Sequence, residues 1–410
     1  MRPRPVGGRL TVLEADERPL WGRSPAEAFV PPGLATGSAD GWSSFERVLC
    51  VRLDAIGDVL MTTPAFRALK AARPDRRLTL LTSTAGAAAG RLVPEIDEVV
   101  VYDPPWMKAT TERDDVEVDR AMVATLAAGH YDAAVVFTVH DQPALPAALL
   151  TYLAGIPRRL AHSRDKPYRL LTEWVAEPEP DAPLRHEVRR QLDLVAAVGV
   201  GAADEHLSVR VPAEASRAIR DRLAGLGVAP RTPWLLVHPG STAPSRTYPG
   251  EAWAAAAREL GEHTSWPIVW SGGPNERSFV NLVRDASGVG TSIAGELTFA
   301  ELTALVAVAP LLVTNNTGPA HIAAAVGTPV VDVYAQTNAQ HGPWQVPNRV
   351  LFADVPCRGC HRSVCPMGHH RCLRDVPPEA VTEAVLDLAA EVGLIDLVAG
   401  RSHEARRAVV

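Results

Sequence analysis

Residues 311–332 read LLVTNNTGPAHIAAAVGTPVVD, and this stretch decides the fold class. It begins with an apolar run that suits a buried strand, continues with an alanine-rich run that suits a helix, and ends in a second apolar run. A strand, a helix and a further strand in this order predict a parallel α/β sheet. The turn at 315–321 points backbone N–H groups and the positive end of a helix dipole towards an anion.

The composition predicts a globular protein of two domains without a nucleic-acid partner. A chain of 410 residues is long for one domain, and its 47% apolar and 21% charged residues are ordinary values. The net charge of −6 disfavours nucleic acid. No apolar run has the length of a membrane span, and the first residues lack the apolar core of a signal peptide. We therefore expect a cytosolic protein, for which peripheral membrane contact stays open.

Two series of apolar strands alternate with helices along the chain, which predicts two α/β units with parallel sheets. Glycine and proline are frequent between residues 200 and 232, as in a hinge between two units. In such sheets ligands bind outside the carboxyl ends of the strands, so we expect the two units to face each other across a cleft. The predicted strands are 48–53, 78–82, 99–102 and 133–137 in the first unit, and 234–237, 268–270, 311–314 and 330–333 in the second.

The predicted domain organisation has four segments. Residues 1–45 show little periodicity and are expected to be a mostly disordered extension. The first α/β unit takes 46–228 and the second takes 229–377. Residues 378–410 form a C-terminal helix, of a kind that often returns to the first domain, and a fraying tail.

The turn after the first strand, RLDAIGDV at residues 52–59, carries a candidate general base. Gly57 allows a tight strand-to-helix turn, and Asp58 falls in the first turn of the helix. The helix dipole there favours an ionised carboxylate, which at the mouth of a cleft can accept a proton. The alternative is an aspartate that only stabilises the start of the helix.

Three turns of the second unit carry groups that suit a phosphorylated ligand, and each turn follows a predicted strand. In HPGST at 238–242 the hydroxyl and backbone groups are donors for phosphate, and a nearby arginine can neutralise a diphosphate. In SGGPNE at 271–276 the glycines permit close approach and the glutamate can accept from ribose hydroxyls. His321 is either a phosphate donor or a structural histidine. The candidates are Ser241, Thr242, Arg246, Gly272, Gly273, Glu276, Thr317, Gly318 and His321.

A basic stretch at 158–169 is a candidate for binding the acceptor. A solvated loop explains any one of its residues, but together they could face an acidic or phosphorylated acceptor. We take Arg164 and Lys166 from this stretch, together with Arg52, as candidate acceptor-binding residues.

Four of the five cysteines lie in one short segment with the pattern C-x2-C-x4-C-x6-C. This spacing in a chain expected to be cytosolic favours a metal site over disulfides, and four sulfur ligands suit tetrahedral zinc or iron in a structural role. The alternative is a loop of reduced cysteines. The candidate ligands are Cys357, Cys360, Cys365 and Cys372.

Five motifs, in their order and spacing, resemble the ADP-heptose:lipopolysaccharide heptosyltransferases, which form glycosyltransferase family nine. The resemblance runs from about residue 47 to residue 377 and leaves the first 45 residues unexplained. The motifs are VRLDAIGDVLMTTP at 51–64, HEV at 186–188, HPGSTAPSR at 238–246, SGGPNE at 271–276 and TNNTGPAHIAAAVGTP at 314–329.

The resemblance implies a GT-B fold, with the acceptor in the first Rossmann-like domain and an ADP-sugar in the second. It implies an inverting transfer of a heptose or related sugar without a catalytic metal or other cofactor. Asp58 falls at the family's catalytic aspartate and Arg246 at its diphosphate-binding residue. Ser241 and Thr242 match positions near the phosphates, and the donor loop is matched by Thr317, Gly318 and His321.

One residue departs from the family pattern. Asn316 stands where the family usually has an aspartate that contacts donor-sugar hydroxyls, so the transferred sugar is left open. The acceptor is also open between a cell-envelope glycan such as lipopolysaccharide, a specialised metabolite and a protein. A non-catalytic protein that binds nucleotide sugars on the same fold is the alternative function. An oxidoreductase is disfavoured because no turn has the G-x-G-x-x-G pattern.

Overall fold

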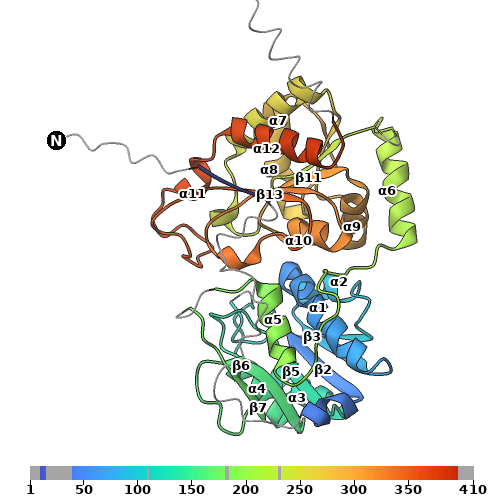
Figure 1. Ribbon diagram of the computed structural model, residues 1–410, viewed down its shortest axis with the longest axis vertical. Coiled ribbons are helices and arrows are strands. Elements are labelled where there is room, and N and C mark those ends of the chain that lie inside the picture. Colours follow the sequence, from blue (N-terminus) through green and yellow to red (C-terminus); the bar gives the residue numbers. More distant parts are fainter. Residues whose placement is uncertain (1–9, 15–38, 109, 181–183, 230–231, 396–410) are drawn as a thin grey trace, which may run out of the picture. The chain divides into compact units, whose positions relative to one another are not determined.

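The computed structural model describes residues 10–14, 39–108, 110–180, 184–229 and 232–395, which form two compact α/β units (Figure 1). The N-terminal unit is Pro19–Arg210. The C-terminal unit is Val211–Val410 together with Met1–Arg18. Both are built on sheets of mainly parallel strands, so the predicted GT-B type of fold, with two Rossmann-like units, is confirmed.

The sheet of the N-terminal unit has six parallel strands in the order β4-β3-β2-β5-β6-β7. The strand order runs outward in both directions from β2 and β5, so the topological switch point lies between these two strands. The strands are β2 (Arg47–Arg52), β3 (Arg77–Thr82), β4 (Glu98–Val101), β5 (Ala133–Val136), β6 (Arg158–Ser163) and β7 (Glu173–Ala176).

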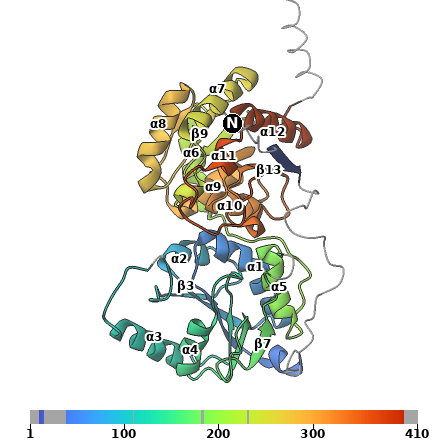
Figure 2. The same cartoon turned by 90° about the vertical axis from the view of Figure 1, so that its left-hand side faces the viewer.

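Five helices cover this sheet. Helix α1 lies beside α2 and α5, and α3 lies beside α4 (Figure 2). Strands β2 and β5 are buried along their apolar runs because helices cover a parallel sheet on both faces. Helix α1 continues without interruption through Pro64. The helices are α1 (Ile56–Ala72), α2 (Thr84–Gly90), α3 (Glu117–Ala128), α4 (Leu145–Leu153) and α5 (Glu187–Ala196).

The sheet of the C-terminal unit has seven strands in the order β1-β13-β12-β11-β8-β9-β10. All neighbours are parallel except β1, which pairs antiparallel with β13. Its switch point lies between β8 and β11, so their carboxyl ends mark the expected ligand site. The strands are β1 (Leu10–Glu14), β8 (Leu235–His238), β9 (Ile268–Trp270), β10 (Thr291–Ser292), β11 (Leu311–Asn315), β12 (Val330–Val333) and β13 (Asn348–Ala353).

The helices of the C-terminal unit form two groups. Helix α7 lies between α8 and α12, while α9 contacts α6 and α10 (Figure 2). Alanine-rich α10 is buried along most of its length, as its sequence predicts. The helices are α6 (Ala213–Gly225), α7 (Gly250–Thr264), α8 (Arg277–Ser287), α9 (Phe299–Val308), α10 (Gly318–Val326), α11 (Arg371–Arg374) and α12 (Pro378–Glu391).

All eight predicted strands are present, each within one residue of its expected ends, but the terminal segments differ from expectation. The predicted disordered extension is wrong at Leu10–Glu14, which is strand β1, and at Ala39–Ser44, a 3-10 helix that buries Trp42. Its other residues, 1–9 and 15–38, lie outside the described part of the chain, as does the tail at 401–410.

The boundary between the units and the position of the last helix also differ from expectation. The N-terminal unit ends at Arg210, so α6 belongs to the C-terminal unit rather than to a first domain that ends at 228. Helix α12 packs on α7, β12 and β13 and therefore belongs to the C-terminal unit. None of the described helices is long and apolar enough to cross a membrane.

We expect Gly86→Ala to destabilise the N-terminal unit, because α2 packs closely on the turn that follows β2. A Cβ atom at Gly86 would lie 2.3 Å from Thr82 Oγ1 and 3.0 Å from the Asp54 carbonyl oxygen. Overpacking of this kind costs about 1–3 kcal/mol, to be measured by urea denaturation. The control is Gly225→Ala in α6, where nothing lies within 4 Å of the new Cβ. Equal stability of the two variants would contradict this packing.

Candidate functional site

Four charged side chains meet at the switch point of the N-terminal sheet, and we call them the Arg52 cluster: Arg52, Asp54, Asp58 and Glu187. Arg52 ends β2, Asp54 lies in the following turn, Asp58 is in the first turn of α1, and Glu187 begins α5. The arginine Nη2 atom lies 3.1 Å from Asp58 Oδ1 and 2.9 Å from Glu187 Oε1. Its Nε atom lies 3.1 Å from Asp54 Oδ2. One guanidinium therefore binds three carboxylates.

The arginine of this cluster is a structural cation, not a surface group. Its side chain is 0% exposed. Although burial lowers its pKa, the charges of Asp54, Glu187 and Asp58 raise the pKa of Arg52 above its ordinary value. Because the guanidinium is enclosed by carboxylates of its own unit, the structure does not support the predicted contact of Arg52 with an acceptor.

A second layer of hydrogen bonds holds Glu187 in place. Gln191, one turn later on α5, donates from Nε2 to Glu187 Oε1 at 2.5 Å and to the Thr138 carbonyl oxygen at 2.9 Å. Glu187 itself is fully buried. The orientation of Arg52 is therefore set from α5 and from the loop after β5, and not from its own strand alone.

Asp58 is held at both oxygens and still reaches solvent. Oδ1 binds Arg52, and Oδ2 accepts a hydrogen bond from the Ala55 N–H at 3.2 Å. The side chain is 18% exposed. The aspartate therefore stabilises the start of α1, as the structural alternative requires, and also presents an oriented carboxylate at the switch point.

Asp54 has a strongly perturbed pKa. Burial raises the pKa of Asp54 to about 7; the Arg52 charge opposes this change, and the carboxylates Asp58, Glu187 and Asp141 add to it. Burial in a cluster with more carboxylates than cations therefore favours the protonated form of Asp54 below about pH 7.

In the C-terminal unit, the loops that follow β8, β9 and β11 are joined by hydrogen bonds at the carboxyl edge of the sheet. His238 Nδ1 lies 3.0 Å from Ser271 Oγ, which joins the first two loops. Asn315 donates to the carbonyl oxygens of Pro239 at 2.7 Å and Gly240 at 3.2 Å, and so joins the third. The turns after these three strands therefore meet at one edge of the C-terminal sheet, which we call the rim.

Glu276 is an ionised group on this rim. Burial acts to raise the pKa of Glu276. The hydrogen bond and the charge of His238, together with the Gly273 N–H, outweigh burial, so the pKa of Glu276 is lowered. Its Oε2 atom accepts from Gly273 N at 2.6 Å and lies 3.4 Å from His238 Nε2. A Cβ at Gly240 would lie 2.3 Å from the Glu276 Cδ atom, and one at Gly272 would lie 2.8 Å from Val280 Cγ2. Internal packing therefore already requires both glycines.

Several buried polar atoms at this edge have no hydrogen-bond partner among the described residues. They are Nε of Arg246, Oγ1 of Thr317 and both carboxylate oxygens of Asp332. Asp332 lies in β12, and burial raises its pKa well above the ordinary value. The charge of Arg246 acts in the opposite direction but is the smaller effect. Because native proteins pair nearly all buried polar groups with protein, water or a ligand, this edge has unused hydrogen-bonding capacity.

The other predicted donor-side residues lie on the same loops with different exposure. Thr242 is exposed, Ser241 is half-buried and His321 is buried. Gly318 begins α10; in its first turn Pro319 has no N–H, and the Ala320 N–H donates to the Thr317 carbonyl oxygen at 3.1 Å. Asn316 is buried, and its Oδ1 atom accepts from the Ala335 N–H at 3.2 Å, which joins the loops after β11 and β12.

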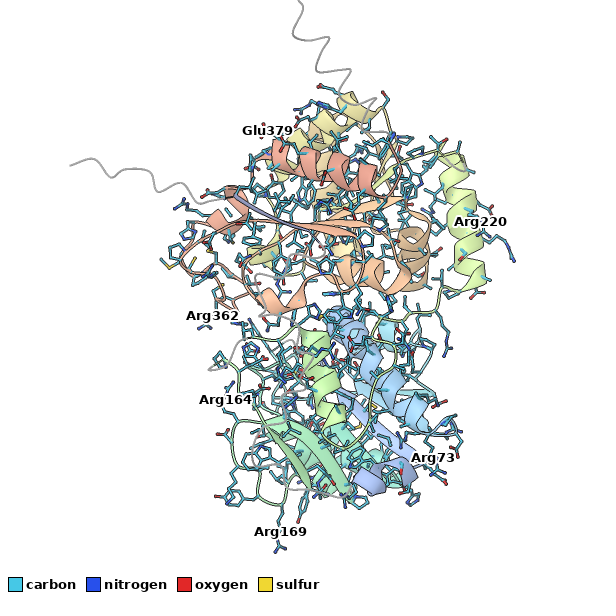
Figure 3. All side chains as sticks on the ribbon, in the orientation of Figure 1. Arg73, Arg164, Arg169, Arg220, Arg362 and Glu379 are labelled. Carbon is cyan, nitrogen blue, oxygen red and sulfur yellow. The ribbon has the colours of Figure 1, made fainter. Side chains whose placement is uncertain are left out.

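The predicted basic loop is partly a strand. Residues 158–163 form β6, and Arg164 follows it at the surface of the N-terminal unit, as does Arg169 (Figure 3). Arg164 Nη2 donates to the carbonyl oxygens of His140, at 3.1 Å, and Glu179. Lys166 Nζ lies 5.4 Å from the ring centre of exposed Tyr168. Both groups are accessible, but Arg164 is also tied to backbone.

The predicted structural zinc or iron site is not supported. In the described ranges, no three or more His, Cys, Asp or Glu side chains form a group that could hold a metal ion. Burial acts to raise the pKa of the Cys365 thiol, but hydrogen bonds from the backbone N–H groups of residues 367–370 outweigh burial and lower this pKa. Cys357 Sγ lies 3.8 Å from His369 Nε2. The absence of a catalytic cofactor stays a prediction.

The cysteine segment instead supports the loops of the rim. The Gly359 N–H donates to the Gln336 carbonyl at 2.7 Å, and the His361 N–H donates to the Thr337 carbonyl at 2.9 Å. The Ser245 N–H donates to the Ser363 carbonyl at 3.0 Å, next to Arg246. The segment thus fixes the backbone from which Arg246 projects.

Sequence reasoning missed Asp54, Gln191 and Asp332 as parts of the two sites. Asp332 interrupts an otherwise apolar strand, which is a readable signal of a special role. Asp54 and Gln191 carry no such signal, because only the fold brings them to Arg52 and Glu187.

Two Rossmann-like units with polar groups at the carboxyl edges of both sheets are the architecture of the GT-B glycosyltransferases. The family model described as "Glycosyltransferase family 9 (heptosyltransferase)" matches residues 120–371, and the chain belongs to this family.

Relatives and solved structures agree with this membership. Lipooligosaccharide heptosyltransferase 2 of Campylobacter jejuni subsp. jejuni is 27% identical over 127 residues, which are 30% of this chain; the chain spans 40% of that relative. A family 9 glycosyltransferase structure from Veillonella parvula has a TM-score of 0.71 at 22% identity and covers 84% of this chain and 98% of its own. E. coli ADP-heptose lps heptosyltransferase II has a TM-score of 0.64 at 20% identity, with coverage of 84% and 99%. Both structures share the fold.

We expect the stability of the N-terminal unit to fall as the pH rises from about 4 to about 7, because Asp54 keeps its proton in the folded state and loses it in the unfolded chain. The side chain of Asp54→Asn cannot titrate. The free energy of unfolding of this variant should therefore rise relative to that of the wild type by on the order of 1–4 kcal/mol across this pH range. The measurement is urea denaturation followed by hydrogen exchange of this unit. Exposed Asp114→Asn is the control. A pH-independent difference between Asp54→Asn and the wild type would contradict the assignment.

Proposed function

We propose that the protein is an inverting glycosyltransferase that moves a heptose or related sugar from an ADP-activated donor to a hydroxyl group of an acceptor. The observation that carries this proposal is the partly exposed carboxylate of Asp58, held by Arg52 at the switch point of the N-terminal sheet. Membership of family 9 gives the reaction class. The name of the E. coli enzyme of the same fold, an ADP-heptose heptosyltransferase, supports the donor.

Asp58 is the general base of the proposed reaction. Its carboxylate takes the proton from the acceptor hydroxyl as the oxygen attacks the anomeric carbon of the donor sugar. The bond between that carbon and the β-phosphate oxygen breaks, and ADP leaves with both bonding electrons. A single displacement inverts the configuration. Arg52 and Glu187 position Asp58, because Glu187 holds the guanidinium group of Arg52 and this group binds Oδ1 of Asp58.

The rim of the C-terminal unit stabilises the leaving ADP in this proposal. Arg246 and the positive end of the α10 dipole stabilise the diphosphate, on which negative charge increases as the bond breaks. Ser241, Thr242 and Thr317 add hydroxyl donors for the phosphates. Glu276, ionised and half-buried, accepts from ribose hydroxyls.

The same observations leave parts of the prediction open. The Oδ1 atom of Asn316 binds backbone, so the amide that replaces the family's usual carboxylate has a structural role beside any contact with the sugar. The choice between heptose and a related sugar stays a prediction, as do a glycan, metabolite or protein acceptor and the cytosolic location.

We expect Asp58→Asn to reduce turnover by about 10²–10⁴-fold, because asparagine keeps an oxygen for the Ala55 N–H but cannot accept the acceptor proton. ADP binding should be unchanged. Turnover is measured as ADP release from a panel of ADP-sugars with cell extract as the acceptor source, and products are identified by mass spectrometry. Asp114→Asn is the matched control. Full turnover of Asp58→Asn would contradict the assignment of Asp58 as the general base. A wild-type protein that binds the donor but shows no turnover would favour the non-catalytic alternative.

We expect Arg246→Gln to weaken ADP binding by about 10–100-fold, the typical effect of losing a charged hydrogen bond to phosphate. Adenosine binding should be unchanged because adenosine lacks the diphosphate. Calorimetric titration of both ligands separates the two effects, with exposed Arg258→Gln in α7 as the control. An equal loss for adenosine and ADP would show that the substitution disturbs the rim as a whole.

A further inference from the structure

A small polar pocket in the N-terminal unit has no role in the proposed transfer step. It lies at the carboxyl ends of β5, β6 and β7, has a volume of about 110 Å³ and is closed on one side by Arg190 of α5. Its walls include Asp141, His162, Arg164, Asp165 and Glu177. The volume admits a few water-sized groups, which is the size of one edge of a sugar ring with its hydroxyls.

Two side chains in this wall, His162 and Gln142, each have a buried atom without a hydrogen-bond partner among the described residues, Nδ1 and Oε1 respectively. His162 is 3% exposed. Its Nε2 atom lies 3.2 Å from the Arg190 carbonyl oxygen. Because a carbonyl oxygen only accepts, Nε2 carries the hydrogen.

The ring of His162 is neutral, so Nδ1 is a hydrogen-bond acceptor. Burial, and then the charges of Arg190 and Arg185, lower the pKa of His162 well below its ordinary value. With Nε2 protonated, the lone pair of Nδ1 is available to a ligand that donates a hydrogen bond. A buried acceptor that stays unpaired is costly, so the pocket is built for a donor group.

The charges around the pocket disfavour an anion. Arg190 binds Glu177 through both Nε, at 2.8 Å, and Nη2. Arg164 Nη2 is bound to two carbonyl oxygens. Two further carboxylates, Asp141 and Asp165, leave the walls with more carboxylates than guanidinium groups. A phosphate would meet this negative charge without a dedicated cation.

The pocket and the Arg52 cluster share one hydrogen-bond network. The Thr138 carbonyl accepts from Arg190 on the pocket side and from Gln191, which binds Glu187, on the cluster side. The charge of Asp141 in the pocket wall also acts on Asp54. A ligand in the pocket is therefore placed on the same edge of the sheet as Asp58.

We propose that this pocket binds an uncharged sugar unit of the acceptor through a hydroxyl group that donates a hydrogen bond to Nδ1 of His162. The proposal rests on the proposed glycosyl transfer, and it narrows the acceptor to one that carries a neutral sugar beside the reacting hydroxyl. It also reverses the expectation, drawn from the basic stretch, of an acidic or phosphorylated group at this place.

The test uses the full chain labelled with ¹⁵N-histidine at pH 7. Methyl α-D-glucopyranoside, methyl α-D-mannopyranoside and inorganic phosphate are titrated separately, while long-range ¹H–¹⁵N spectra report the imidazole nitrogens. We expect at least one glycoside to move the unprotonated Nδ1 resonance of His162 upfield in a saturable way, and phosphate to leave it unchanged.

His162→Gln assigns the resonance and tests the contact, because a glutamine amide can still donate to the Arg190 carbonyl but has no acceptor at the Nδ1 position. Glycoside binding should weaken roughly three- to tenfold, the effect of one neutral hydrogen bond. Exposed His263→Gln in α7 is the control and should bind as the wild type does. If His162→Gln fails to fold, the Nδ1 resonance of His162 is assigned from sequential triple-resonance spectra of the wild type, and its shift with glycoside decides.

Three outcomes would overturn the proposal: a phosphate-induced shift of Nδ1 stronger than that of any glycoside, no saturable glycoside shift, or binding that His162→Gln leaves intact in a folded protein. Asp58→Asn separates this result from the transfer reaction, since the variant should keep the glycoside shift while it loses turnover. If Asp58→Asn has full turnover and keeps the glycoside shift, Asp58 is not the general base, but the assignment of the pocket as a sugar site still holds.

Discussion

One buried guanidinium group holds together the part of the N-terminal unit on which the proposed chemistry depends. Arg52 is enclosed by Asp54, Asp58 and Glu187, which come from a turn, from α1 and from α5. Burying a charge is costly unless the charge is paired and hydrogen-bonded. Here the three carboxylates stabilise the buried guanidinium group, and the guanidinium group in turn holds each carboxylate in position. The raised pKa of Asp54 lets this carboxyl group bind a proton as the pH falls below neutral, which reduces the surplus of negative charge around Arg52.

The C-terminal unit has the opposite character at its carboxyl edge. There the loops are joined by backbone and side-chain hydrogen bonds, while Arg246, Thr317 and Asp332 keep buried polar atoms without partners in the described part of the chain. A site that is satisfied within itself suits a base whose position must not change. A site with unpaired groups suits a ligand that arrives and leaves, since binding supplies the missing hydrogen bonds.

The sequence predicts the two sheets well because buried parallel strands are local apolar runs. Strand β6 was read as a solvated basic loop because Arg158 and Arg159 open it; Arg159 is in fact buried and donates to backbone carbonyl oxygens. At the sites, Asp58 and the donor-side turns follow from motifs. The pairing of Arg52 with Glu187, 135 positions apart, does not, because only the packing of α5 on α1 creates it.

Strand β1 has a consequence for how the protein is made. Its partner is β13, so Leu10 pairs with Ala353, roughly 340 residues later in the chain. A ribosome that adds about 5–20 residues per second needs on the order of 20–70 s to supply that partner. Strand β1 therefore waits through the synthesis of the whole N-terminal unit before it can pair, and the C-terminal sheet is completed by a strand that is made before that unit.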